Sequence, residues 1–220
     1  ANIPVVAFDG ENYLVVWEED LPNSFAIYGI RVSKKGFVLD KEPVAISNER
    51  CTARSPDIAF DGSDYLVIWQ DYCKGSNDID IYGTRVSKSL EVLDPDGIPI
   101  STASNQQLYP KVAFDGTDYF AVWSDNRRNT SYDIYGAHVD KNGIVLEKEG
   151  VVVNNRSGSQ TDPAIAFDGK NYLIVWGNGK DIYGMRMSPD GGFPGTSGSG
   201  SSVFGPVEIP VSGAMNGQSL

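Results

Sequence analysis

Acidic and basic side chains gather in the polar segments that follow four tryptophans of the sequence. These segments differ in length and cover residues 18–26, 70–80, 124–133 and 177–181. Carboxylates bind cations and ligand hydroxyl groups, whereas arginines bind anionic groups. Loops of unequal length on a fixed scaffold are where proteins often place such contacts. We therefore expect the ligand-binding residues to be Asp71, Asp78, Asp125, Arg127 and Arg128.

The sequence lacks the common motifs of nucleophilic and metal-dependent catalysis. His138 is the only histidine, which excludes a zinc cluster built on several histidines and leaves one choice for a Ser-His-Asp triad. There is no Walker loop, no Cys-x-x-Cys pair and no Gly-x-Ser-x-Gly elbow. Carboxylates are the remaining candidates for catalysis.

The four tryptophans belong to a repeat that covers nearly the whole chain. Its first motif occurs as VAFDGENYLVVW (6–17), IAFDGSDYLVIW (58–69), VAFDGTDYFAVW (112–123) and IAFDGKNYLIVW (165–176). A second motif follows at 27–33, 81–87, 134–140 and 182–188, each time beginning Ile-Tyr-Gly. A Val/Ile-rich segment completes each unit of about 53 residues. A repeat of this length indicates a solenoid, a propeller or an array.

Each unit holds four strand-sized segments separated by turn residues. The segment that ends on tryptophan is apolar on both faces, so both faces of its sheet need cover. Antiparallel four-stranded blades repeated around an axis supply that cover. The sequence therefore predicts an all-β, four-bladed β-propeller with four antiparallel strands per blade. The ring is either closed by one chain or is half of a larger ring that a partner completes.

The repeat boundaries predict a single domain over residues 1–220. The blades span approximately 1–50, 51–104, 105–157 and 158–220, with a flexible Gly/Ser loop at 189–202. Two features favour a closed ring of four. Small alanines share one face of the first strand and suit a narrow channel. The end of the chain (216–220) followed by its beginning (1–10) also resembles the internal junction at 104–116.

The positions of the first strand that we expect to face the axis do not supply a catalytic pair. They are Val5, Asp57, Lys111 and Ala164. Glycoside hydrolysis usually takes two carboxyl groups on either side of the scissile bond, and this set contains one. We therefore expect no enzymatic activity.

Two further sets of residues give structural predictions. Phe60 and Tyr65 flank a hairpin turn and their numbers sum to 125, whereas Cys51 and Cys73 sum to 124. The two cysteines therefore lie nearly opposite and predict a disulfide, with two free thiols in loops as the alternative. A disulfide implies an oxidising, extracytoplasmic setting. The second set pairs Arg31 and Arg85 with the acids two residues past the tryptophans, Glu19 and Asp71. In the third repeat Asp125 faces His138, and in the fourth Asn178 stands where Arg186 would need an acid, so the pairing is not uniform. The alternative is that the arginines bind a carboxylate of a ligand.

The four repeats, each an alanine-containing strand, a glycine turn and an aromatic strand, resemble hemopexin-type four-bladed propellers. The motifs AFDG, YLVVW and IYG are similar to repeats of secreted or surface-attached bacterial and archaeal propeller proteins. The disulfide that closes the hemopexin ring between first and last blades is absent. The resemblance implies an ion in the axial channel, such as calcium or sodium, on the backbone carbonyls of Ala7, Ala59, Ala113 and Ala166. The alternative is a water-filled channel, and no cofactor is required.

The net charge of −11 argues against a nucleic-acid partner. No apolar run approaches the 18 residues of a spanning helix, so we expect no membrane insertion. We predict a non-enzymatic binding or scaffold module, extracellular or at the cell surface, with a glycan or protein ligand on one rim. The alternative is a structural domain of a surface layer or filament, through self-association or as part of a parent multidomain chain. A glycoside-acting enzyme is the third reading.

Overall fold

The computed structural model describes residues 1–192 and 207–209, which form sixteen strands in four antiparallel sheets. Residues 193–202 of the expected Gly/Ser loop lie outside the described residues. Blade 1 contains β1 (Asn2–Phe8), β2 (Asn12–Leu21), β3 (Ser24–Ser33) and β4 (Val44–Ala45). Blade 2 contains β5 (Ala53–Phe60), β6 (Asp64–Asp71), β7 (Asp80–Ser87) and β8 (Ile98–Ser101). Blade 3 contains β9 (Gln107–Phe114), β10 (Tyr119–Asp125), β11 (Asp133–Val139) and β12 (Val151–Asn154). Blade 4 contains β13 (Thr161–Phe167), β14 (Tyr172–Gly177), β15 (Ile182–Met187) and β16 (Val207–Ile209).

The strands of each blade pair in chain order, as the sequence predicts for a propeller. An Asp-Gly turn joins the first two strands of every blade. In blade 2, Gly62 has a φ of +97°, a backbone conformation that glycine adopts freely and that is unfavourable for residues with a side chain. The preceding Asp61 accepts hydrogen bonds from the backbone amides of Ser63 and Asp64 at 2.7 and 2.8 Å. This Asx-type turn fixes the register in which Phe60 faces Tyr65.

The core consists of three apolar clusters, one between each pair of neighbouring blades. At the middle junction, Leu66 and Ile68 of β6 pack against Tyr119, Ala121 and Trp123 of β10. All five side chains are buried. The second strand of an interior blade therefore contributes to two clusters, which explains why its sequence is apolar on both faces.

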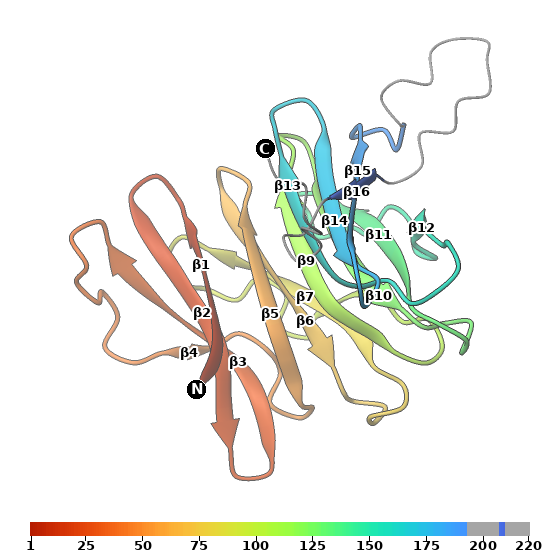
Figure 1. Cartoon of the computed structure of the whole chain (residues 1–220). Coiled ribbons are helices and arrows are strands. Elements are labelled where there is room, and N and C mark those ends of the chain that lie inside the picture. Colours follow the sequence, from red (N-terminus) through yellow and green to blue (C-terminus); the bar gives the residue numbers. More distant parts are fainter. Residues whose placement is uncertain (193–206, 210–220) are drawn as a thin grey trace, which may run out of the picture.

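The described parts of the four sheets lie side by side in chain order, from blade 1 at the left of Figure 1 toward blades 3 and 4 at the right. β1 packs beside β5, β5 beside β9, and β9 beside β13. Among the described residues, β1 and β13 have no comparable contact. The four-bladed architecture is thus confirmed. The described residues form an arc of four blades, and not the closed ring that two features of the sequence favoured.

The alanines that suggested closure serve a different purpose. Ala7, Ala59 and Ala113 pack at the edges of the three apolar clusters between blades. A small side chain there lets neighbouring inner strands approach one another. Their recurrence therefore follows from blade-to-blade packing, and it does not require a narrow axial channel.

Each inner strand is interrupted by a bulge at one equivalent position. The register shifts by one residue there in all four first hairpins. The bulged residues have φ between +47° and +54° and are Ile3, Ser55, Tyr109 and Asp162. A proline follows each of them in the sequence, and proline inside a strand is typical of bulges. No helix long and apolar enough to cross a membrane occurs in the described part of the chain.

Candidate functional site

The four inner strands, β1, β5, β9 and β13, contain two carboxyl side chains, Asp57 and Asp162. Asp57 follows the bulge of β5 by two residues, and Asp162 is the bulged residue of β13. Both therefore lie toward the end of the blades where the inner strands begin. The connections between the second and third strands lie at the same end, which we call the loop rim (Figure 1). They are long loops in blades 2 and 3, but the segment 18–26 expected as a loop in blade 1 extends the two strands, which end at Leu21 and begin again at Ser24.

Asp57 connects blade 2 to blade 3. Its Oδ2 accepts a hydrogen bond from the backbone amide of Val112 at 2.8 Å, and the Nζ of Lys111 lies 3.9 Å from Oδ1. The side chain is 19% exposed. Burial raises the pKa of Asp57, because it penalises the charged carboxylate more than Lys111 and the backbone hydrogen bonds favour it. Such a carboxyl group can hold a proton at a pH where an exposed aspartate has lost it.

Asp162 is exposed and lines a cavity of about 370 Å³ on blade 4. Trp176, Lys180 and Asp181 also line this cavity. An indole, an ammonium group and two carboxylates provide both an apolar surface and hydrogen-bonding groups for a polar organic ligand. Sequence reasoning did not identify Asp162, because it considered only the positions after the bulge. The proline that follows each bulge was the signal.

The predicted ligand-binding residues of the third blade bind one another. Asp125 is buried, and its carboxylate accepts hydrogen bonds from Trp123 Nε1 and from Arg127 Nε, both at 2.8 Å. The guanidinium of Arg127 also stacks 3.9 Å above the ring centre of Tyr135. Arg128 lies 3.8 Å from the carboxylate of Asp133. These contacts hold the loop in place, and a role in ligand binding stays a prediction.

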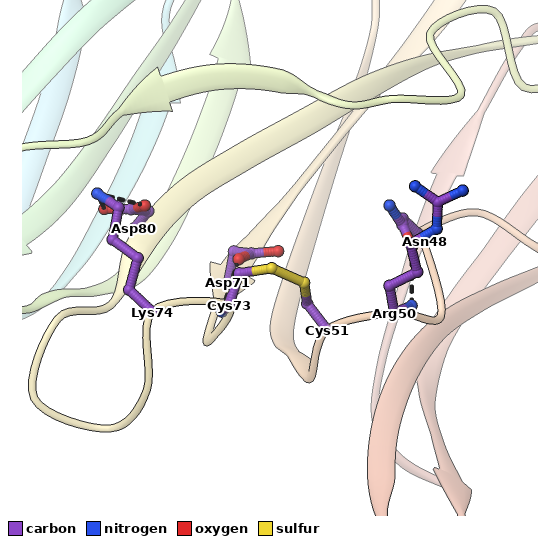
Figure 2. Close-up of a disulfide and its surroundings, with 7 residues drawn as sticks. All are labelled: Asn48, Arg50, Cys51, Asp71, Cys73, Lys74 and Asp80. Carbon is purple, nitrogen blue, oxygen red and sulfur yellow. Dashed lines mark hydrogen bonds and ion pairs between the residues drawn. A yellow bond between two sulfur atoms is a disulfide. The ribbon is translucent and has the colours of Figure 1, made fainter.

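The predicted disulfide between Cys51 and Cys73 is confirmed, with a Cα–Cα distance of 4.8 Å. Figure 2 shows Asp71 beside it, and its Oδ1 accepts a hydrogen bond from the Cys73 amide at 2.9 Å. In the same loop Lys74 lies 4.0 Å from Asp78 and 3.0 Å from Asp80. The disulfide therefore links this loop to the segment before β5, and the ion pair with Asp80 links it to the start of β7. Ligand binding by Asp71 and Asp78 also stays a prediction.

The expected partners of the repeated arginines were wrong. Arg31 pairs with Asp40 at 2.5 Å and Arg85 with Asp94 at 2.8 Å, in each case with the acid nine residues further along. The acids two residues after the tryptophans accept hydrogen bonds from other groups. Trp17 Nε1, for example, donates to Glu19 at 2.6 Å. The interpretation that the charges pair within one blade is correct, but it applies to different acids.

The alanines proposed as axial carbonyl ligands lie in the ladders between first and second strands. Their partners in these ladders are Leu14, Leu66, Phe120 and Leu173. An axial cation stays a prediction for this chain.

Comparisons with known proteins identify a fold but no family. No family model matches the chain, and no curated protein matches it. Among solved structures, an endo-arabinase from Bacteroides thetaiotaomicron is similar with a TM-score of 0.57 and 15% identity, over 86% of this chain and 75% of that one. An exo-1,5-alpha-L-arabinanase from a bovine ruminal metagenomic library gives 0.55 and 15%, over 94% and 77%. A neuraminidase-like protein of A/little yellow-shouldered bat/Guatemala gives 0.62 and 13%, over 87% and 57%.

These likenesses confirm the propeller fold, but they do not show the expected likeness to hemopexin-type propellers. They also overturn the prediction of a non-enzymatic module, because two of the three structures are named as an arabinase and an arabinanase. The prediction rested on the four positions that follow the bulges, which hold one carboxyl group, and it did not consider the bulged residues themselves, of which Asp162 carries a second.

Proposed function

We propose that this chain is a glycoside-acting enzyme with its active site on the concave side of the blades, near the loop rim. The observation that carries the proposal is Asp57, a mostly buried carboxyl group on an inner strand whose pKa burial raises. The named activity of the similar arabinase and arabinanase supports a glycoside as the substrate. The disulfide supports an extracellular location, where polysaccharides are accessible.

The two inner-strand carboxyl groups suit different tasks in glycoside hydrolysis. A protonated carboxyl group donates its proton to the leaving glycosidic oxygen, and a second carboxylate activates water or attacks the sugar. We assign proton donation to Asp57, because its surroundings favour the protonated form. We assign the second task to Asp162, because it is the other carboxyl group on the inner strands and its side chain is exposed. Lys111, 3.9 Å from Asp57, stabilises the carboxylate that forms after proton transfer.

The proposal is tested by measuring reducing-sugar release from arabinan and dye release from aryl arabinofuranosides. The variants are Asp57→Asn and Asp162→Asn, which keep side-chain size and remove the acid. We expect each to lower kcat by about 100-fold or more, within the range of general acid–base contributions. Asp96→Asn, an exposed acid in a turn of blade 2, is the control and should keep full activity.

Thermal unfolding of every variant separates loss of chemistry from loss of fold. The proposal is refuted if wild-type protein releases no product from arabinan, from other plant polysaccharides or from aryl glycosides. It is also refuted if hydrolysis survives in both inner-strand variants.

A further inference from the structure

In the described part of the chain, the outward faces of the first and last blades carry exposed apolar side chains. On blade 1, Val6 is 58% exposed and Tyr13 is 38% exposed. On blade 4, Leu173 is 46% exposed. Scattered apolar side chains are common on protein surfaces, whereas a contiguous apolar sheet face usually marks an interaction site.

The interior blades show what normally covers these faces. Val6 corresponds to Ile58 and Val112 in the repeat, which are 8% and 7% exposed. Tyr13 corresponds to Tyr65, Tyr119 and Tyr172, which are at most 1% exposed. Each of these residues is buried against the preceding blade. Leu173 corresponds to Leu14, Leu66 and Phe120, which are fully buried against the following blade.

Polar groups also meet across the interior junctions between neighbouring blades. The hydroxyl of Tyr119 donates to the carbonyl oxygen of Asp64, in the Asp-Gly turn of the preceding blade, at 2.9 Å. Burial and the nearby carboxylate of Asp9, in the equivalent turn of blade 1, raise the pKa of Tyr65. The corresponding donor and acceptor lie at opposite ends of the arc. The donor is the hydroxyl of Tyr13 on blade 1, and the acceptor is the turn at Asp168 on blade 4.

A second hydrogen bond recurs at two of the interior junctions. Nη1 of Arg31 donates to the carbonyl oxygen of Lys88 in the next blade at 3.1 Å, and Nη1 of Arg85 donates to that of Lys141 at 3.3 Å. On blade 4 the equivalent arginine, Arg186, is exposed and pairs through Nη2 with Asp168 of its own blade at 2.9 Å, which leaves Nη1 for such a contact. The equivalent acceptor on blade 1 is the carbonyl of Lys34. The two outward faces therefore match in both apolar and polar groups.

We propose that copies of this chain associate head to tail, with the outward face of blade 1 on one copy packed against the outward face of blade 4 on another. A second copy is the appropriate occupant because it carries both halves of the junction, whereas β1 and β13 of one chain lie apart. Two copies related by a twofold axis make the contact twice, and neither outward face then remains uncovered.

Sedimentation or light scattering of the full chain over a concentration series tests this proposal. We expect a species of twice the 23.9 kDa chain mass, or a longer assembly of the same contact. Because each copy has a net charge of −11, added salt should strengthen the association by screening repulsion. A monomer of 23.9 kDa at every concentration and salt level would overturn the proposal.

Charged substitutions identify the surfaces. Val6→Glu places a charge in the apolar face of blade 1, and Leu173→Glu places one in that of blade 4. Each substitution alone should abolish the closed pair of copies. Mixed together, they should form a one-to-one complex, because each variant keeps the half that the other lacks. This recovery also shows that both variants are folded.

Matched controls are Ile144→Glu and Val152→Glu, at apolar side chains of blade 3 that are 57% and 42% exposed and lie outside the two faces. They should associate as the wild type does. If the controls dissociate as readily, or if the mixed variants stay monomeric, the contact is not the one proposed.

Discussion

Removing the disulfide tests how the second hairpin is stabilised. Cys51 and Cys73 are 22 residues apart in the sequence and join the segment before β5 to the segment after β6. A cross-link stabilises mainly by reducing the chain entropy of the unfolded state, and a 15-residue loop contributes about 3 kcal/mol at 25 °C. The slightly longer loop here should contribute roughly 3.5 kcal/mol. The Cys51→Ser/Cys73→Ser protein is therefore expected to be less stable by about that amount.

Urea unfolding followed by tryptophan fluorescence measures this difference. With an m-value of about 3 kcal/mol/M, the midpoint should fall by roughly 1 M. Reductant should lower the midpoint of the wild type by a similar amount and leave the double variant unchanged. Equal midpoints for the oxidised wild type and the double variant would refute the entropic reasoning, since the loop would then be constrained without the bond.

Two further substitutions test contacts within and between the blades. Gln70→Leu removes the acceptor of the Tyr109 amide, which lies 2.7 Å from Gln70 Oε1 at the bulge of β9, and should cost about 1–3 kcal/mol in urea unfolding. Gln70→Glu should lose less, because Glu18 already accepts the equivalent amide of Ser55 in the preceding junction, and equal losses would contradict this explanation. For Asp94, burial raises the pKa but the hydrogen bonds from Arg85 outweigh it, so the folded-state pKa lies below 3.8. The free energy of unfolding that Asp94 contributes over Asp94→Asn should therefore be fully present above pH 3.8 and be lost as the pH falls through the folded-state pKa, and a difference independent of pH would be inconsistent with the pair.

The blades could be predicted because each is encoded four times. Trp17, Trp69, Trp123 and Trp176 recur at one position of the repeat, and the Asp-Gly turns before them fix the same hairpin register in each copy. The disulfide could be predicted for the same reason, since a known register extends past the ends of the strands. Local rules of turn and strand geometry are sufficient for these features.

Relations between blades were harder to predict. A small side chain such as Ala59 is consistent with a narrow channel or with close packing of two inner strands, and only the arrangement of the sheets distinguishes the two. The partner of Arg85 depends on a loop that brings Asp94 back beside β7, which strand alternation does not specify. Asp162 was missed because a bulge changes which residues lie near the end of the strand.

The pH dependence of arabinan hydrolysis tests the proposed active site most directly. If Asp57 donates the proton, product release by the wild type should fall as the pH rises through its raised pKa, and Asp57→Asn should be nearly inactive at every pH. The alkaline limb should therefore lie above the pKa of an ordinary aspartate. Hydrolysis by Asp57→Asn at the wild-type rate and with an unchanged pH profile would contradict the account.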